Sequence, residues 1–239
     1  MSQIAIVTGA SGLVGMQLLH RLFRDEKYDW VVVLGRRELT LKHPKLVQLK
    51  IDFEKLDGLD LVAAIRENDR GGDYQNLVQH LEKGNGTIHA YSSLGTTIKD
   101  AGSKENFYRI DHDYVVGFAR WAHRLGAKRF LYVSAIGANP RAKVFYNKVK
   151  GEVEHDLKSI PFEYLGLFQP SLLLGNRRES RLGEIVGGVL LKGLNLIGLF
   201  RKYKPIYGHQ VARVMVERAG DADRQGVETI SSTEMHKLT

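Results

Sequence analysis

Three polar residues in the second half of the chain have the types and spacing of a proton-transfer site. Tyr146 and Lys150 lie four residues apart, so on a helix their side chains share one face. A lysine ammonium beside a phenol favours the phenolate and lowers its pKa, which lets tyrosine exchange a proton nearer neutral pH. Ser134 lies twelve residues before Tyr146 and is expected to donate a hydrogen bond to the same substrate oxygen. Because Tyr-x-x-x-Lys is also common on ordinary solvated helices, the pair is interpreted as catalytic only together with a cofactor site.

A glycine-rich stretch near the N-terminus, TGASGLVG over residues 8–15, joins an apolar strand to an amphipathic helix. In a dinucleotide-binding loop the first glycine permits a tight turn and the second lets the backbone approach a pyrophosphate. The third lets the helix pack close to the sheet. The free N–H groups at the start of the helix then face the phosphates. The residues of this loop expected to contact the cofactor are Gly9, Ser11, Gly12, Leu13, Val14 and Gly15.

The end of the second apolar strand, VVVLGRRE, indicates which dinucleotide binds. An NAD site usually carries Asp or Glu there, which accepts a hydrogen bond from the ribose 2′-hydroxyl. This chain has Arg36 and Arg37, whose forked, permanently charged guanidinium groups suit a 2′-phosphate instead. NADP(H) is therefore the predicted cofactor; the alternative is a solvated arginine pair in a loop. Asp52, just past the third strand, is either an adenine contact or a helix N-cap.

Strand and helix patterns alternate along most of the chain. Strands are predicted over residues 4–9, 30–35, 46–51, 87–93 and 129–135, and helices over residues 13–24, 55–68, 73–83, 108–125 and 144–158. Apolar runs without polar alternation are typical of strands buried on both faces. Strands joined by helix-length segments indicate βαβ units. The predicted fold class is therefore α/β, a doubly wound parallel sheet of the Rossmann type, with a small C-terminal substrate lobe.

The C-terminal part is less regular. A sixth strand is predicted over residues 163–174, and an apolar, glycine-rich stretch follows over residues 185–200. That stretch has 16 residues and contains Lys192, whereas a bilayer span needs ~20 apolar residues. It is interpreted as a helix packed over a substrate cleft, with an amphipathic membrane-surface helix as the alternative.

We expect one NAD(P)-binding domain over residues 1–239, with a small substrate or lid region around residues 171–205. Arg177 and Arg181 follow the sixth strand, where doubly wound folds open their cleft at the carboxyl ends of the strands. They are interpreted either as a binding site for an anionic substrate group or as part of an ion-pair cluster that fixes the loop.

Composition narrows the function classes. The chain has 239 residues, a formal net charge of +8 and no cysteine. Without cysteine, disulfide scaffolds, thiol catalysis, Fe–S clusters and Cys-bearing zinc sites are excluded, and no metal site is predicted. The basic residues form short separate clusters, which suit a phosphorylated small ligand better than a nucleic acid. The N-terminus enters an apolar strand at once, so a cytoplasmic protein is expected.

Together these motifs resemble the short-chain dehydrogenase/reductase superfamily over nearly the whole chain. Finer features are similar to an atypical branch, the NAD(P)H-binding proteins related to human Tat-interacting protein: LGRRE, SSLGTT, VSAIGA, FYNKVKGEVE and QPSLLLGNRRESRLGE. The resemblance implies a Rossmann fold, NADPH binding and a Ser–Tyr–Lys active site. It adds Leu94, Gly95, Thr96, Tyr146 and Lys150 to the expected cofactor contacts.

The chain also departs from the superfamily pattern. Extended members often carry an asparagine on the fourth helix that holds a proton-relay water, and residues 109–122 contain none. Two hypotheses follow: an NADPH-dependent oxidoreductase acting on a small carbonyl or alcohol, or a cofactor-binding regulatory protein with little turnover. A sugar-nucleotide epimerase or dehydratase is less favoured, because such enzymes usually need a larger C-terminal lobe. Residues 69–86 are longer and more hydrophilic than the resemblance leads us to expect.

Overall fold

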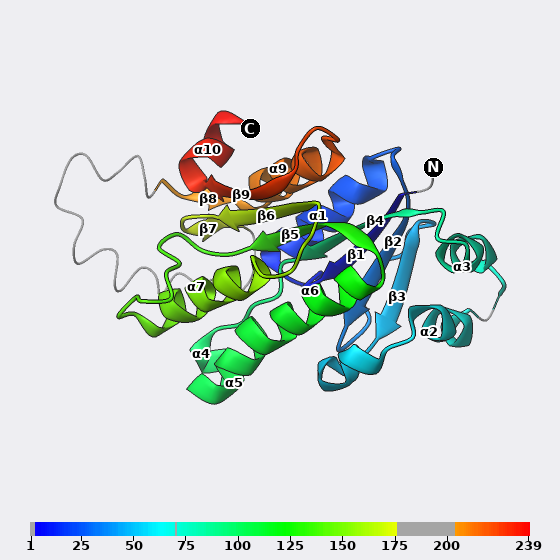
Figure 1. The fold of residues 1–239 in the computed structure, drawn as a ribbon, viewed down its shortest axis with the longest axis horizontal. Helices are drawn as coiled ribbons and strands as arrows, with labels where there is room; N and C mark the ends of the chain where they lie inside the picture. Colours follow the sequence, from blue (N-terminus) through cyan, green and yellow to red (C-terminus); the bar gives the residue numbers. More distant parts are fainter. Residues whose placement is uncertain (1–2, 70, 176–203) are drawn as a thin grey trace.

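The computed structural model describes residues 3–69, 71–175 and 204–239. Its centre is a seven-stranded parallel sheet in the order β3-β2-β1-β4-β5-β6-β9 (Figure 1). The strands are β1 (Gln3–Thr8), β2 (Tyr28–Gly35), β3 (Leu46–Lys50), β4 (Thr87–Ser92), β5 (Ala127–Val133), β6 (Tyr164–Gln169) and β9 (Gly226–Ser231). The inner strands are almost wholly buried, as the apolar runs predicted. The predicted α/β, doubly wound class is confirmed.

Helices cover both faces of the sheet. They are α1 (Leu13–Arg24), η1 (Phe53–Gly58), α2 (Leu61–Asn68), α3 (Gln75–Glu82), α4 (Ile98–Ala101), α5 (Lys104–Tyr108), η2 (Arg109–Asp113), α6 (Tyr114–Arg124), α7 (Phe145–Leu157), α9 (Gly208–Gly220) and α10 (Ser232–Lys237). One hydrophobic cluster joins the sheet to α1, α9 and α10, and the other joins it to η1, α2, α3, α6 and α7. Among the described residues no helix is long and apolar enough to span a membrane.

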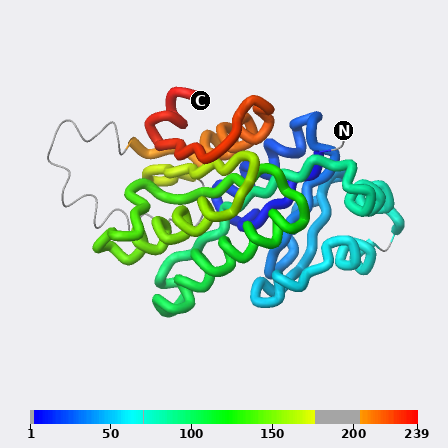
Figure 2. Tube along the Cα trace, viewed as in Figure 1, coloured from blue at the N-terminus to red at the C-terminus, as the bar shows by residue number. Residues whose placement is uncertain are grey.

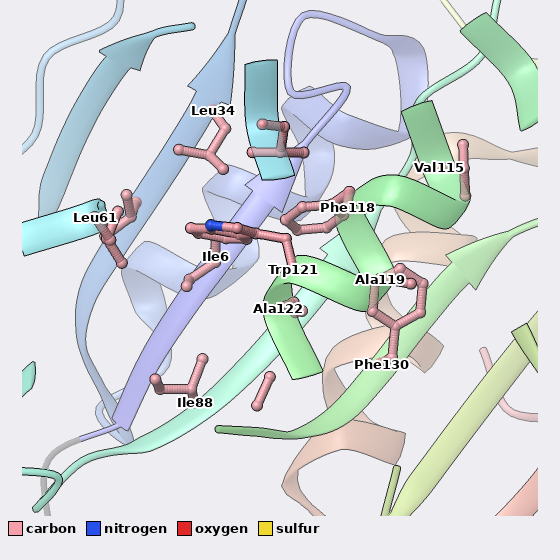
Figure 3. Close-up of a cluster of buried hydrophobic side chains, with 14 of the residues drawn as sticks. Ile6, Leu34, Leu61, Ile88, Val115, Phe118, Ala119, Trp121, Ala122 and Phe130 are labelled. Atoms are coloured by element: carbon pink, nitrogen blue, oxygen red, sulfur yellow. The ribbon is translucent and has the colours of Figure 1, made fainter. Parts of the chain in front are cut away.

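Helix α6 shows how one face is packed. Its side chains Phe118 and Trp121 point at the sheet, where Ile6 and Phe130 lie (Figure 3). All four are at most 4% exposed, and the Trp121 indole N–H donates a 3.0 Å hydrogen bond to the carbonyl oxygen of Leu59. Burial of these large side chains fixes α6, and with it the η2 turn directly before it, against the sheet.

The strand order reverses beside β1. The chain runs outward from β1 to β2 and β3, then returns through α2 and α3 to β4 on the other side of β1 (Figure 2). In such sheets the loops after the two central strands separate and leave a crevice at their carboxyl ends, where ligands bind. The glycine-rich loop follows β1 and residues 93–97 follow β4, so both segments border this crevice.

Several element boundaries differ from the prediction. The predicted helix over 55–68 is broken, because the Asp60 carboxylate accepts a hydrogen bond from the Ala63 N–H and starts α2 anew. The predicted strand over 163–174 is interrupted at Pro170, which cannot donate to a ladder. Its remainder, β7 (Leu173–Leu174), pairs with β8 (Ile206–Tyr207) in a separate two-stranded sheet.

Two further stretches show elements that the sequence patterns did not indicate. Helices α4 and α5 lie before the helix predicted over 108–125, and the predicted helix itself is divided into the π-helical turn η2 and α6. In the hydrophilic stretch 69–86, the Asp69 carboxylate accepts hydrogen bonds from the Asp73 and Tyr74 backbone N–H groups just before α3. The lid around 171–205 stays a prediction, since residues 176–203 lie outside the described residues.

A buried histidine on the α1/α9 face predicts how stability depends on pH. His89 is 3% exposed, and its Nδ1 lies 2.6 Å from the Tyr28 hydroxyl. Burial, aided by the nearby Arg129 charge, lowers the pKa of His89 to about 4. Between about pH 4 and pH 6.5 the unfolded chain binds a proton here that the folded chain does not. The free energy of unfolding is therefore expected to fall by about 3 kcal/mol as the pH drops through this window.

Urea denaturation at several pH values measures this slope. His89→Gln keeps a hydrogen-bond acceptor for Tyr28 but cannot be protonated, so the slope should flatten. His20→Gln, on the exposed side of α1, serves as the control and should keep the wild-type slope. An unchanged slope in His89→Gln would rule His89 out as its source.

Candidate active site

The glycine-rich loop has a backbone that only glycine tolerates at two positions. Gly9 has φ +74°, and a Cβ there would lie 2.4 Å from the Ser93 carbonyl carbon. A Cβ on Gly15 would lie 2.2 Å from the Gly9 carbonyl oxygen. The loop is therefore held close to the β4 loop, and the single Ser93 hydroxyl proton is shared between the Thr8 and Gly9 carbonyl oxygens, each 3.2 Å from Ser93 Oγ.

The start of α1 suits an anionic ligand. Gly12 is the N-cap and supplies no side-chain acceptor, and the first turn contains no acidic residue. The N–H groups of that turn and the positive end of the helix dipole are thus available to a phosphate. Val14 is buried, so only its backbone can take part, whereas Ser11 and Leu13 line a cavity of about 750 Å³. The loop geometry fits a dinucleotide pyrophosphate.

Arg36 and Arg37 line a second cavity on the other side of the loop. Both side chains are exposed, and the cavity of about 430 Å³ lies between the ends of β1 and β2. Its lining is completed by Ala10, Ser11, Val33, Leu34, Gly35 and Leu39. A groove that combines aliphatic side chains with two guanidinium groups suits an adenosine that carries a phosphate.

Of the two roles expected for Asp52, an adenine contact or a helix N-cap, the structure shows the N-cap. Its carboxylate accepts a 3.0 Å hydrogen bond from the Glu54 N–H and caps η1. Arg177 and Arg181, the predicted substrate contacts, lie outside the described residues.

Lys150 lies at the centre of a buried polar cluster, which forms the predicted proton-transfer part of the site. Its side chain is 4% exposed, and its Nζ is 2.9 Å from Asp111 Oδ1 and 3.0 Å from the Tyr132 hydroxyl. The same Nζ lies 5.9 Å from the centroid of the Tyr146 ring. The predicted helix over 144–158 is confirmed as α7, and it places Tyr146 and Lys150 on one face, as their spacing required.

The loop after β4 lies against this cluster. The Thr96 N–H donates a 2.7 Å hydrogen bond to Asp111 Oδ2. Gly95 is exposed, and a Cβ there would come within 3.3 Å of Asp111 Oδ1 and 3.6 Å of Lys150 Nζ. Gly95 therefore lies directly over this ion pair, and a side chain at this position would crowd it. Leu94 is half-buried in the same loop.

The Tyr146 pKa shifts in the opposite direction to the one expected from the neighbouring Lys150. Burial raises the pKa of Tyr146 above its ordinary value; Lys150 opposes this, and Asp111 adds to it. Burial alone would discharge Lys150, but the Asp111 carboxylate and the two phenols outweigh it and raise the Lys150 pKa well above its ordinary range. For Asp111, burial raises the pKa while Lys150 and the Thr96 N–H oppose the rise. We conclude that Lys150 is charged and that Tyr146 is protonated at neutral pH.

Ser134 also differs from its predicted role as a donor to the substrate. It follows β5, is 4% exposed, and donates a 2.5 Å hydrogen bond to Glu154 Oε1. The Gln169 amide donates to both oxygens of the same carboxylate, at 2.9 and 3.2 Å. A hydroxyl has one proton, so Ser134 must leave Glu154 before it can donate to a substrate oxygen.

The residues that the sequence patterns missed are Asp111, Tyr132, Glu154 and Gln169. Glu154 lies four residues after Lys150, so the helical spacing that joined Tyr146 to Lys150 extends to it. Asp111 carried no comparable signal, because a second aspartate, Asp113, lies two residues further on and only the geometry of η2 turns Asp111 inward and leaves Asp113 exposed. Asp111 lies within residues 109–122, the stretch that contains no asparagine.

Sequence comparison agrees with this geometry. Residues 5–145 match the model of the NAD dependent epimerase/dehydratase family. The chain is 31% identical to "Protein FMP52, mitochondrial" of Debaryomyces hansenii, over 98% of this chain and 97% of that protein. It is 34% identical to "Protein HTATIP2" of Rattus norvegicus, over 74% of this chain and 66% of that protein. The resemblance inferred from the sequence motifs is confirmed.

Solved structures share the fold at low identity. The enzyme WbmG of Bordetella bronchiseptica, in complex with NAD, has a TM-score of 0.63 and 15% identity, covering 100% of this chain and 76% of that one. UDP-glucose 4-epimerase of Thermotoga maritima has a TM-score of 0.61 and 14% identity, covering 99% and 81%.

The comparisons also correct one expectation. The FMP52 relatives of three yeasts are named as mitochondrial proteins, which contradicts the cytoplasmic location expected from the N-terminus. An apolar strand near the start of a chain reports on the sheet that it enters rather than on a compartment. The family match over residues 5–145, the full-length similarity to the FMP52 proteins and the glycine-rich loop lead to one conclusion: the chain belongs to the NAD dependent epimerase/dehydratase family.

Proposed function

We propose that the protein is an NADPH-dependent oxidoreductase that interconverts a small carbonyl compound and the corresponding alcohol. The observation that carries the proposal is the buried Lys150 ammonium beside Tyr146, under Gly95 of the same β4 loop that contacts the glycine-rich loop. A pure binding module needs the loop but not a protonated phenol held beside a buried cation.

The residues divide the work between holding the cofactor and moving a proton. The N–H groups at the start of α1 would hold the pyrophosphate, and Arg36 and Arg37 the 2′-phosphate. Bound NADPH would supply a hydride to the substrate carbon. Tyr146 would donate its hydroxyl proton to the substrate oxygen, so that a carbonyl leaves as an alcohol. Ser134 would orient that oxygen once its hydroxyl leaves Glu154.

The Arg36 and Arg37 side chains are expected to decide the choice of cofactor. Charge-assisted hydrogen bonds to the 2′-phosphate contribute about 1.5–3 kcal/mol each. The dissociation constant for NADPH should therefore be lower than that for NADH by a factor of about 10 or more. Changing both arginines to alanine should remove most of this preference while leaving NADH affinity nearly unchanged. Fluorescence titration with each cofactor measures both constants.

Arg120→Ala, on the exposed side of α6, is the matched control and should keep the preference. Equal affinity of the wild-type protein for both cofactors would overturn the NADPH assignment. A panel of carbonyl compounds with the preferred cofactor then tests turnover. Tight NADPH binding without oxidation of NADPH by any member of the panel would favour the regulatory alternative.

A further inference from the structure

Asp111 is the one carboxylate in direct contact with Lys150 among the described residues. Both side chains are nearly inaccessible, at 1% and 4% exposure, so the pair is not screened by solvent. Two elements hold Asp111 in place. The π-helical turn η2 directs it inward, and the Thr96 N–H donates to its second oxygen. Asp111 is therefore held from two sides in contact with Lys150, the cation that Tyr146 meets.

We propose that Asp111 is a positioning residue of the active site: it fixes the Lys150 ammonium and offsets its charge, so that Tyr146 keeps its proton and serves as the acid. This inference rests on the proposed function for its chemical meaning. A lone ammonium near a phenol would instead favour the phenolate, which cannot donate.

The groups packed around the two residues support this assignment. Lys150 meets Asp111 from η2 and Tyr132 from β5. Tyr146 meets the Lys150 ammonium on its own helix and the uncharged Phe107 ring from α5, at 6.0 Å between centroids. The cation that favours a phenolate is therefore paired with Asp111, while burial disfavours the phenolate directly.

Absorbance at 295 nm, which reports tyrosinate, tests the inference without any substrate. The chain has ten tyrosines, so single substitutions are compared with the parent protein. The difference between wild type and Tyr146→Phe should show no tyrosinate below about pH 9.5. A tyrosine that ionises near neutral pH in the wild-type protein, and whose signal is missing from Tyr146→Phe, would overturn the proposal. This result does not depend on whether any Asp111 variant folds.

The same titration of Asp111→Asn is the second test of the inference. Removing the carboxylate charge should let one tyrosine ionise about 1 unit or more lower, while Asp111→Glu should titrate like the wild type. The shifted ionisation should vanish in Asp111→Asn/Tyr146→Phe and persist in Asp111→Asn/Tyr132→Phe. Circular dichroism verifies that each variant is folded. If folded Asp111→Asn titrates like the wild type, or if the shifted group is Tyr132, the inference is wrong. Failure to find a substrate would affect the proposed function and leave these titrations unchanged.

Discussion

Tyr146→Phe is expected to lower the turnover of a carbonyl substrate by about 100-fold or more while leaving NADPH affinity nearly unchanged. The substitution removes one hydroxyl oxygen and its proton but keeps the ring beside Phe107 and Lys150. Burial already holds the Tyr146 hydroxyl in its protonated form, so the proton donor is lost without replacement by another group at the same atom. Steady-state kinetics with any substrate identified in the carbonyl panel measures the loss.

Tyr114→Phe is the matched control, because this partly exposed tyrosine on α6 donates a hydrogen bond to Glu54 away from the cluster. It should turn over the substrate at the wild-type rate. If Tyr146→Phe retains normal turnover, the proton comes from elsewhere and the assignment of the acid fails. If NADPH affinity also collapses, Tyr146 acts mainly in binding.

The Lys150–Asp111 pair is expected to give the largest effects on stability. Removing one partner leaves an uncompensated charge in the interior, which costs about 3–5 kcal/mol. Asp111→Asn and Lys150→Met should each lower the free energy of unfolding by that order, or the melting temperature by roughly 10 °C for a domain of this size. The double variant should be much less destabilised than the sum of the two, because it leaves no buried charge unpaired.

Urea denaturation of the four proteins measures this coupling. The exposed pair Arg66–Glu82, which joins α2 and α3, provides the control. Its single variants should each cost less than about 1 kcal/mol, because solvent screens the pair. Additive losses at Lys150 and Asp111, or single losses as small as those of the control, would show that the two groups do not act as a buried ion pair.

The cofactor half of the site could be predicted from the sequence because its signals are local. Gly9 and Gly15 are needed by a turn and a close approach within a few residues of one another, and the structure shows both constraints. Arg36 and Arg37 were placed by their position at the end of a strand, and they line the cavity beside the loop. Such patterns depend on backbone geometry that neighbouring residues determine.

The proton-transfer half could be predicted only along one helix. The spacing of Tyr146 and Lys150 placed them on one face of α7, but the charge that Lys150 presents depends on Asp111, which belongs to another helix. The direction of the Tyr146 pKa was therefore expected incorrectly, since burial and a carboxylate far along the chain outweigh the lysine. Likewise, Ser134 was expected to donate a hydrogen bond to a substrate oxygen, whereas in the structure it donates to the Glu154 carboxylate.

The class of the fold follows from the amino-acid sequence alone, because apolar β-branched runs alternating with helical patterns can be buried well only in a parallel sheet covered on both faces. The sequence also predicted where the glycine-rich loop lies, since the first strand, the loop and the first helix are consecutive in the chain. Which groups meet at Lys150 depends instead on how the elements pack against one another. Tyr132, Asp111 and the exposed Gly95 belong to three separate segments that the fold brings together. The pairing of buried charges depends on distances between these segments, which no spacing along the chain encodes.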